Sequence, residues 1–379
     1  MGPPVEMLLQ PAHISVPPCF DEVGERLTQI RQFVNADDTQ TIKPGVLCLI
    51  LQSFGQIFLQ SLSLFRLVRL WFEDELSHGA FCTFPFHIIL AIEIDLTGYN
   101  QGNKKMPLEQ IIVLALIQGI TEFLPISSSG HLAILSDLTD WKDQGIAMDV
   151  MMHVGSLAAI IVYFWGDVLN LAAGGLDLLR LHLSDRARLA LYIVLATIPA
   201  VLFGLLLKSS GYLDALRADP TAKLTIIGWT AIIYGTILYL ADRFGPDTKR
   251  MEEMKLPPAL LIGIAQMFAL IPGTSRSGIT ISAARFLGFS RPEAARFSFL
   301  LGMPAIAGAG LLTFKEAYET GATFSADIWL AAVLSFVVSF AAIAFLMALV
   351  KRMSFAPFVI YRLILGAFLL SLANGYIAI

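Results

Sequence analysis

The sequence predicts an all-α polytopic membrane protein, built as an inverted-topology repeat with two re-entrant helical hairpins. Its composition is the first observation: of 379 residues, 56% are hydrophobic and 15% are charged, and the mean hydropathy is +0.70. Soluble domains carry about 25% charged residues, so this composition indicates a membrane protein. The other two observations are six long apolar runs and two similar polar motifs within shorter apolar segments. The net charge of -4 is too small to indicate a nucleic-acid partner.

Residues 1–105 differ from the rest of the chain. They open on the Pro-rich stretch GPPVEMLLQPAHISVPP, contain all three cysteines and lack the basic and apolar regions of a signal peptide. The apolar run 46–72 contains Arg66 and Arg69, and a central Arg costs about 2.5–3.5 kcal/mol on insertion scales, so we do not expect it to span a membrane. We expect residues 1–105 to be an atypical extension, either disordered or the product of a mispredicted start, and residues 106–379 to form the membrane-embedded domain.

Six apolar runs after residue 106 have the length of about 20 residues that a membrane-spanning helix needs. They lie near residues 147–165, 188–208, 222–241, 294–313, 327–350 and 357–377. Shorter apolar segments flank two polar motifs, at 109–124 and 131–138 and again at 256–271 and 279–288. Eight to ten helical residues cover only half a bilayer core, about 12–15 Å, so these segments predict re-entrant hairpins.

The two motifs predict an internal repeat. Gln118 precedes Gly130 by 12 residues, and Gln266 precedes Gly278 by the same interval, 148 residues later. Three predicted passes, an odd number, separate the motifs, so the second hairpin would enter from the opposite face. We therefore predict inverted repeat halves at about 106–241 and 256–379, with a site near the membrane midplane between broken helices.

Glu122 and the serines that follow it are the first candidate site residues. An ionised carboxylate in an apolar segment is costly unless it is paired or hydrated, so Glu122 is either a general base or metal ligand, or a loop-end residue that reaches the interface. Ser127, Ser128, Ser129 and Gly130 are typical of a turn and helix N-cap, but such a turn also offers N–H groups and a helix dipole to an anion. One of these hydroxyls could instead act as a nucleophile.

His131 follows directly, in the first turn of the next predicted helix. A lone histidine in a membrane segment is often a packing residue that is hydrogen-bonded. Beside Glu122 and three serines it is also a candidate acid, base or nucleophile.

Arg276 stands between two apolar runs and is permanently charged. Its guanidinium matches phosphate in bidentate geometry, which predicts an anion site; the alternative is an internal salt bridge with Glu122. The neighbouring Thr274, Ser275, Ser277 and Gly278 add hydroxyls and N–H groups to this predicted phosphate site.

Other charged residues indicate solvation or topology rather than chemistry. We expect Arg285, Arg291 and Arg296, at predicted membrane ends, to be solvated or to extend toward lipid headgroups. The basic clusters in residues 242–255 and 351–352 favour the cytoplasmic side for both loops. Part of the segment between predicted passes at 167–188 is expected to form an interfacial helix.

The motifs QGITEFLPISSSGHL, PGTSRSGITI and FSFLLGMP resemble those of the bacterial undecaprenyl-diphosphatase family, the bacitracin-resistance proteins, over about residues 106–379. The resemblance implies an integral membrane phosphatase that hydrolyses undecaprenyl diphosphate to undecaprenyl phosphate and inorganic phosphate. That reaction recycles the lipid carrier for peptidoglycan synthesis and confers bacitracin resistance. It also implies the bacterial cytoplasmic membrane, with an active site toward the outer face.

By motif position, the resemblance implies catalytic roles for Glu122, Ser128, His131 and Arg276, with Arg276 holding the diphosphate. It further implies a divalent cation, Mg²⁺ or Ca²⁺, with Glu122 and Gln118 as candidate ligands. The family has Glu or Gln at the first motif position, and Gln118 here weakens any mechanism that needs two carboxylates on one metal.

We therefore predict a polyprenyl diphosphate lipid as substrate, surrounding membrane lipids and no nucleic-acid partner; a homo-oligomer is compatible with the sequence. The rival class is an inverted-repeat secondary transporter or lipid-phosphate flippase, which needs binding groups but no acid–base pair beside a hydroxyl. A purely structural scaffold would leave Glu122 and Arg276 unexplained.

Overall fold

The computed structural model of the chain describes residues 106–139, 141, 144–211, 219–319 and 325–377. The predicted extension, residues 1–105, lies outside them. The described residues are helical apart from turns and one isolated bridge between Lys249 and Phe289. The all-α prediction is confirmed for this part of the chain.

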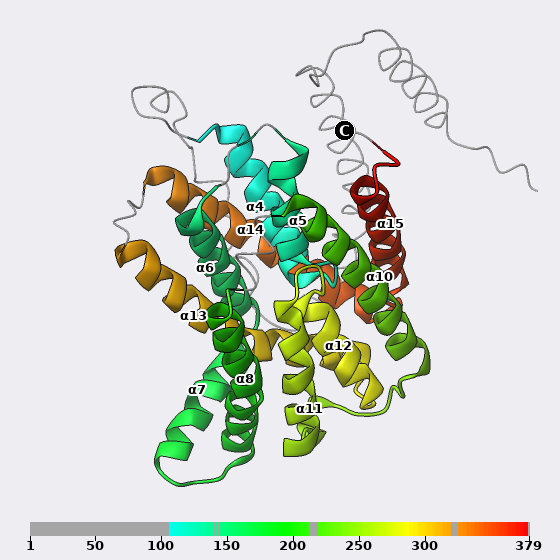
Figure 1. Cartoon of the computed structure of the whole chain (residues 1–379). Helices are drawn as coiled ribbons and strands as arrows, with labels where there is room; N and C mark the ends of the chain where they lie inside the picture. The colour runs from blue at the N-terminus through cyan, green and yellow to red at the C-terminus, as the bar shows by residue number, and fades with distance from the viewer. Residues whose placement is uncertain (1–105, 140, 142–143, 212–218, 320–324, 378–379) are drawn as a thin grey trace, which may run out of the picture. The chain divides into compact units, whose positions relative to one another are not determined.

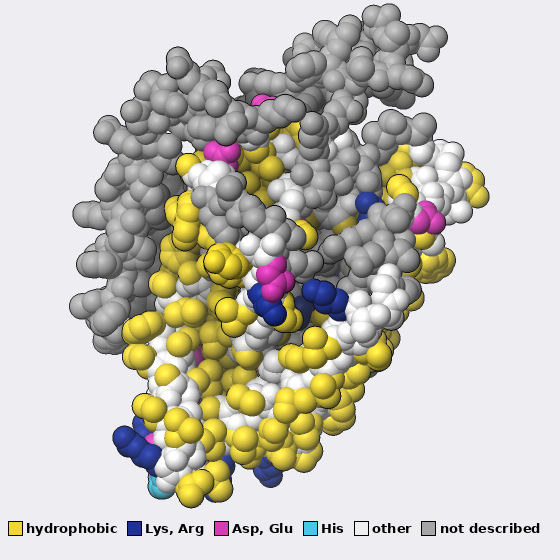
Figure 2. All heavy atoms as spheres, turned by 60° about the vertical axis from the view of Figure 1, so that its left-hand side comes forward, with side chains coloured by type: hydrophobic (Ala, Val, Ile, Leu, Met, Phe, Trp, Pro, Cys, Tyr) yellow, Lys and Arg dark blue, Asp and Glu magenta, His cyan; other side chains and the backbone are white. Residues whose placement is uncertain are grey.

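Six of the described helices are long and apolar enough to cross a membrane, at the six predicted positions. They are α6 (Ile146–Tyr163), α8 (Asp185–Ser209), α10 (Pro220–Phe244), α13 (Arg291–Glu319), α14 (Ala326–Val350) and α15 (Ala356–Ala373). Hydrophobic side chains cover most of the described surface on the face in Figure 2, and charged side chains gather in a few clusters. A surface of this kind suits a lipid environment, and the chain is a multi-pass membrane protein.

Two helical hairpins occupy the places of the two motifs. The first consists of α4 (Leu108–Phe123) and α5 (Ser128–Leu138). The second consists of α11 (Leu256–Met267), the short 3₁₀ helix η4 (Phe268–Leu270) and α12 (Arg276–Phe286). The starts of α4 and α11, and of α5 and α12, are each separated by the predicted interval of 148 residues, and α5 and α12 both have 11 residues. The repeat that the motifs predict is therefore present in the backbone.

The two ends of the second hairpin lie side by side and are joined by backbone hydrogen bonds. The Lys249 N–H donates to the Gly288 carbonyl at 2.9 Å, and the Ser290 N–H donates to the Lys249 carbonyl at 3.0 Å. In Figure 1 the first hairpin opens toward the top of the view and the second toward the bottom, with their turns close together in the middle. This arrangement fits an inverted repeat, and re-entry of the hairpins into a membrane stays a prediction.

The two halves of the repeat interlock rather than forming separate lobes. The arm α4 of the first half packs on α14 of the second, and the equivalent arm α11 packs on α8 of the first. Helices α10 and α15 pair with each other across the halves. The largest buried cluster accordingly draws its side chains from both halves, from Phe123 to Val359.

Small residues let α14 approach α4 and α6 closely. A Cβ on Gly119 would overlap Val338 and the Ser339 nitrogen, and a Cβ on Gly155 would overlap the Ala332 carbonyl oxygen. Ser156 joins the same contact, with its Oγ 3.1 Å from Ser335 Oγ and 3.0 Å from Ser339 Oγ. Small side chains and interhelical hydroxyl contacts of this kind hold helices together where the surroundings are apolar.

The segment predicted to contain an interfacial helix forms α7 (Trp165–Leu179), which packs on α8; its place at a membrane interface stays a prediction. Its closing turn is fixed by Asp177, which accepts from Arg186 Nε at 2.7 Å and from Ser184 Oγ at 2.6 Å. Donation from the Arg186 guanidinium lowers the pKa of the Asp177 carboxyl to about 2. The ionised carboxylate therefore holds this turn at neutral pH.

The expectation that Arg285, Arg291 and Arg296 are solvated is wrong for Arg285. That residue is almost fully buried and donates to the carbonyls of Gly245, Pro246 and Phe289. Arg291 pairs with Asp242 at 2.5 Å, and Arg296 pairs with Asp167. Buried carbonyls replace water for the Arg285 guanidinium, whereas Arg291 and Arg296 each stay 29% exposed.

Candidate active site

The site forms where the two hairpin turns meet. Each turn ends in a serine with positive φ, Ser127 at 79° and Ser275 at 72°. Ser127 Oγ accepts from the Gly130 N–H at 3.3 Å, and Ser275 Oγ accepts from the Gly278 N–H at 3.2 Å. Both serines are therefore N-caps, as one alternative predicted for the stretch from Ser127 to Gly130, and the caps set the directions of α5 and α12.

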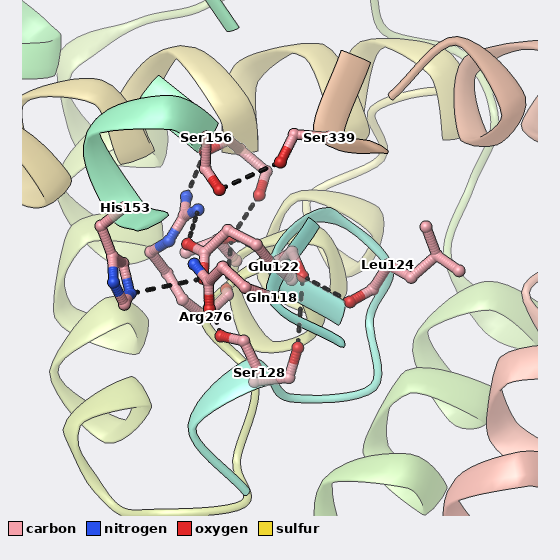
Figure 3. Close-up of polar contacts among 12 residues, drawn as sticks. Gln118, Glu122, Leu124, Ser128, His153, Ser156, Arg276 and Ser339 are labelled. Carbon is pink, nitrogen blue, oxygen red and sulfur yellow. Dashed lines mark hydrogen bonds and ion pairs between the residues drawn. The ribbon is translucent and has the colours of Figure 1, made fainter. Parts of the chain in front are cut away.

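Glu122, in the last turn of α4, is the centre of the site. Its side chain is only 7% exposed, which excludes a loop-end residue that reaches the interface. Oε2 accepts from Ser128 Oγ at 2.7 Å and from Gln118 Nε2 at 3.3 Å, and Oε1 accepts from Arg276 Nη2 at 3.1 Å (Figure 3). Three donors compensate the buried carboxylate, so it can remain ionised there.

Arg276 begins α12 and reaches across to the first hairpin. The internal salt bridge to Glu122 that one alternative predicted is confirmed at 3.1 Å. Arg276 Nη1 donates to the Ser298 carbonyl at 3.4 Å, and a Cβ on Gly302 would overlap the guanidinium. The third motif, FSFLLGMP, thus supplies the wall of α13 against which Arg276 lies. At 14% exposure, the guanidinium remains within reach of a ligand.

The remaining predicted phosphate-binding residues divide by access. Ser129 is exposed and its Oγ lies 3.4 Å from Ser127 Oγ. Thr274 and Ser277 are fully buried, and Ser277 Oγ donates to the Leu124 carbonyl at 3.2 Å. Gly130 and Gly278 are buried where the turns pack: a Cβ on Gly130 would lie 3.4 Å from the Gly273 Cα. Thr274, Ser277 and both glycines thus lie buried where the turns pack, and their role in phosphate binding stays a prediction.

His131 is not turned toward Glu122. Its Nδ1 lies 2.6 Å from the Ser127 carbonyl oxygen, and its Nε2 lies 2.5 Å from the Tyr361 hydroxyl of α15. The His131 and Tyr361 rings stack with an interplanar angle of 12°. Both ring nitrogens are therefore engaged, and they connect the first hairpin to α15.

Two residues of the site were missed in the sequence. His153 of α6 places Nε2 at 3.8 Å from Glu122 Oε2. Arg362 of α15 is fully buried and donates to the carbonyls of Pro125 and Gly273, one in each hairpin turn, at 3.3 and 3.0 Å. Arg362 is the one charged residue of its predicted pass, whereas the predicted pass of His153 also contains Asp149. An Arg at the centre of a membrane span costs about 2.5–3.5 kcal/mol on insertion scales, so the sequence could have identified Arg362 as a site residue. A His in such a span is not specific enough to identify His153.

The described residues contain no group of three or more His, Cys, Asp or Glu side chains placed to hold a metal ion. Two side chains could contribute oxygen ligands to a cation, the Glu122 carboxylate and the Gln118 amide. Gln118 Oε1 is buried without a hydrogen-bond partner among the described residues. Any cation here would take most of its ligands from a substrate and water.

Comparison with known proteins identifies the family. The family model for the bacitracin resistance protein BacA matches residues 111–368. The undecaprenyl-diphosphatase of Erythrobacter litoralis is 47% identical over 279 residues, which cover 69% of this chain and 98% of that protein. Undecaprenyl-diphosphatase 1 of Rhodospirillum rubrum is 48% identical over 277 residues, covering 71% of this chain and 96% of that protein, and the undecaprenyl-diphosphatase of a Ruegeria species is 46% identical over 275 residues, covering 71% and 100%. The matched region and these identities show that this chain belongs to the BacA bacitracin resistance family.

Proposed function

We propose that this protein is an undecaprenyl-diphosphate phosphatase, which releases inorganic phosphate and returns undecaprenyl phosphate to peptidoglycan synthesis. The observation that carries this proposal is the Glu122–Ser128–Arg276 cluster between two hairpin turns, inside a bundle whose surface is apolar. A lipid diphosphate has both parts that such a site recognises, an anionic head for Arg276 and an apolar tail for the membrane. The names of the relatives support the same activity.

Binding of the lipid diphosphate would use the salt bridge between Arg276 and Glu122. The diphosphate oxygens compete with Glu122 for the Arg276 guanidinium, which can bind two phosphate oxygens at once. The exchange compensates the negative charge of the head group and partly releases Glu122 to accept a proton. Positioning and charge stabilisation of this kind supply most of the catalysis in phosphoryl transfer.

Two attack routes fit the geometry. Ser128 Oγ donates to Glu122 Oε2 at 2.7 Å, so the carboxylate can take the serine proton as Oγ attacks the terminal phosphorus. Alternatively, Glu122 takes a proton from water. In both routes the bond from the terminal phosphorus to the bridging oxygen breaks, and the electron pair leaves with the lipid monophosphate. In the serine route a water then hydrolyses the phosphoserine, which frees the Ser128 hydroxyl and releases inorganic phosphate. A phosphoenzyme on Ser128 would establish the serine route, and full activity of Ser128→Ala would exclude it.

His131 stays a predicted catalytic residue, but its contacts favour a different role. Its ring nitrogens contact the Ser127 carbonyl oxygen and the Tyr361 hydroxyl. His131 therefore holds the serine turn against α15 rather than activating the attacking group. Loss of activity in a His131 variant would then reflect displacement of Ser128.

A divalent cation, Mg²⁺ or Ca²⁺, fits the proposal in a limited way. Glu122 and the unpaired Gln118 Oε1 could provide two protein oxygens, with diphosphate oxygens completing the shell as is common for Mg²⁺. When bound, the cation would neutralise charge on the diphosphate. Arg276 and Gln118 Nε2, from this chain itself, already provide positive charge and hydrogen bonding next to Glu122.

The proposed location is the bacterial cytoplasmic membrane, with the site open to the outer face. The Phe355 N–H donates to Asp242 at 3.0 Å, which brings the two basic loops, residues 242–255 and 351–352, to one end of the bundle. The positive-inside rule favours the cytoplasm for that end. The second hairpin opens there, so the first hairpin, with Glu122 and Ser128, opens to the outer side.

Phosphate release by the purified full-length protein from undecaprenyl diphosphate tests the proposal. Arg276→Ala should lower kcat about 10²–10³-fold, the range for removal of one donor to developing charge. Arg180→Ala, which removes an exposed arginine at the end of α7, is the control and should keep full activity. An inactive wild-type protein, or a fully active Arg276→Ala variant, would contradict the proposal.

The inverted arrangement of the hairpins favours one rival, a lipid-phosphate flippase or secondary transporter. The same preparation distinguishes the two functions. Transfer of intact substrate between the leaflets of vesicles without phosphate release would establish the transporter.

A further inference from the structure

His153 lies one step beyond the residues that the motifs identify, on α6 rather than on either hairpin. Its Nδ1 lies 2.7 Å from the Asp149 carbonyl oxygen, which can only accept a hydrogen bond. Nδ1 must therefore carry a proton, and in the neutral ring Nε2 carries the lone pair. That nitrogen faces Glu122 Oε2 at 3.8 Å (Figure 3).

The distance defines what can lie between the two groups. A separation of 3.8 Å is too long for a direct hydrogen bond, yet one small atom can lie about 2.8 Å from both Nε2 and Oε2. Both groups are hydrogen-bond acceptors. A phosphoryl oxygen, itself an acceptor, would be repelled there, whereas a water molecule can donate one hydrogen to each.

The same carboxylate oxygen accepts the Ser128 hydroxyl, so the water position adjoins the predicted centre of the reaction. The side chain of His153 is 36% exposed, so its ring is accessible in part, whereas Glu122 is 7% exposed. A water that donates one hydrogen to each of these two groups directs its lone pairs away from both of them, where they can meet the phosphorus of a bound substrate.

We propose that His153 is a further catalytic residue, whose Nε2 and Glu122 Oε2 together hold and orient the attacking water. The water oxygen bonds to the terminal phosphorus, and the bridging P–O bond breaks with its electron pair leaving on the lipid monophosphate. The proton that the water loses passes to Glu122. His153 keeps the remaining hydrogen in place. The assignment rests on the proposed phosphatase function and selects its water route.

Two conservative substitutions isolate Nε2. In His153→Asn the amide nitrogen occupies the place of Nδ1 and preserves the contact with the Asp149 carbonyl, but nothing replaces Nε2. In His153→Gln the longer amide can place its carbonyl oxygen, an acceptor, near the Nε2 position. His182→Ala removes an exposed histidine in the turn between α7 and α8 and serves as the control. All are measured as full-length protein, with undecaprenyl diphosphate, over a Mg²⁺ titration that reaches saturation.

We expect His153→Asn to lower kcat about 30-fold or more, with KM nearly unchanged, and His153→Gln to recover most of that loss. His182→Ala should match wild type. Wild-type kcat in His153→Asn, or equal losses in the Asn and Gln variants, would overturn the assignment. A change confined to the half-saturating Mg²⁺ concentration would overturn it as well, because it would make His153 a cation ligand.

Size-exclusion elution and thermal unfolding verify that each variant is folded. If His153→Asn is not monodisperse, His153→Ser replaces it and is judged by the same outcomes. An inactive wild-type protein contradicts the phosphatase function itself, whereas active wild type with active His153→Asn contradicts only the role of His153.

Discussion

Glu122 combines two properties that are rarely compatible, burial and charge. Its carboxylate is held by Arg276, Ser128 and Gln118, each of which donates to it. Arg276 is therefore both the salt-bridge partner and the predicted phosphate ligand. In the proposed mechanism, the two alternatives for Arg276 describe one residue before and after substrate takes over its hydrogen bonds.

Gln118→Glu should strengthen cation binding at the site. A second carboxylate next to Glu122 adds charge and one oxygen ligand, so the half-saturating Mg²⁺ concentration for phosphate release should fall about tenfold. Without a cation, like-charge repulsion should make this variant less active than wild type. Activity titrated with Mg²⁺ after chelation measures both effects.

Gln118→Ala is the matched control, because it removes the amide without adding charge. An unchanged Mg²⁺ titration in Gln118→Glu would show that no cation binds near Glu122.

Helix α15 connects the two hairpin turns through its Arg362. The guanidinium donates to Pro125 and Gly273 in the two turns and to Thr230 and Ala231 in α10. The described structure gives it no carboxylate partner, so four carbonyl groups compensate its charge. One residue thereby sets how the two turns face each other.

Arg362→Met should destabilise the protein by about 3–5 kcal/mol, because it leaves several buried carbonyls without a donor. Arg362→Lys keeps the charge but cannot reach all four acceptors, so it should fall between Met and wild type. Denaturant unfolding in detergent measures the loss. Arg243→Met on exposed α10 surface is the control, and equal stabilities of the two Met variants would refute the role of Arg362.

Gly155→Ala should prevent the close contact between α6 and α14. The added Cβ would overlap the Ala332 carbonyl oxygen, and overpacking of this kind costs about 1–3 kcal/mol. A Cβ on Gly308 of α13 would meet open space, so Gly308→Ala should be neutral or slightly stabilising. Thermal unfolding of the pair tests this, and equal melting temperatures would contradict the packing argument.

Across the whole molecule, the repeat is symmetric in backbone and asymmetric in chemistry. Ser128 and Arg276 occupy the same position, the first residue of α5 and of α12, 148 residues apart. At that interval Glu122 corresponds to Leu270, and His153 corresponds to Leu301. The first half thus supplies the carboxylate and the hydroxyl, and the second half supplies the guanidinium of Arg276. Neither half holds a complete site.

A chain that begins at Met106 should keep full phosphatase activity. Every residue of the candidate site lies beyond that point, and 71% of this chain accounts for the full length of the Ruegeria relative. Expression of residues 106–379 beside the full chain, with phosphate release and elution profile as readouts, tests this. Lost insertion or activity would show that residues 1–105 contribute to the protein.

By itself the sequence determined the six long helices, the two hairpins and the central residues Glu122, Ser128 and Arg276. Apolar length, the 148-residue interval and isolated charges are local properties of the chain, so they can be read without knowing what packs on what.

Only the tertiary structure decided the remaining partners. His131 contacts Tyr361, while His153 and Arg362 reach the site from α6 and α15, which lie outside the two hairpins. Their positions depend on how α6 and α15 pack against the hairpins. They also depend on the packing of α4 on α14 and of α11 on α8, each a contact between the two halves. Contacts between segments so far apart in sequence follow from packing in three dimensions, which no local pattern specifies.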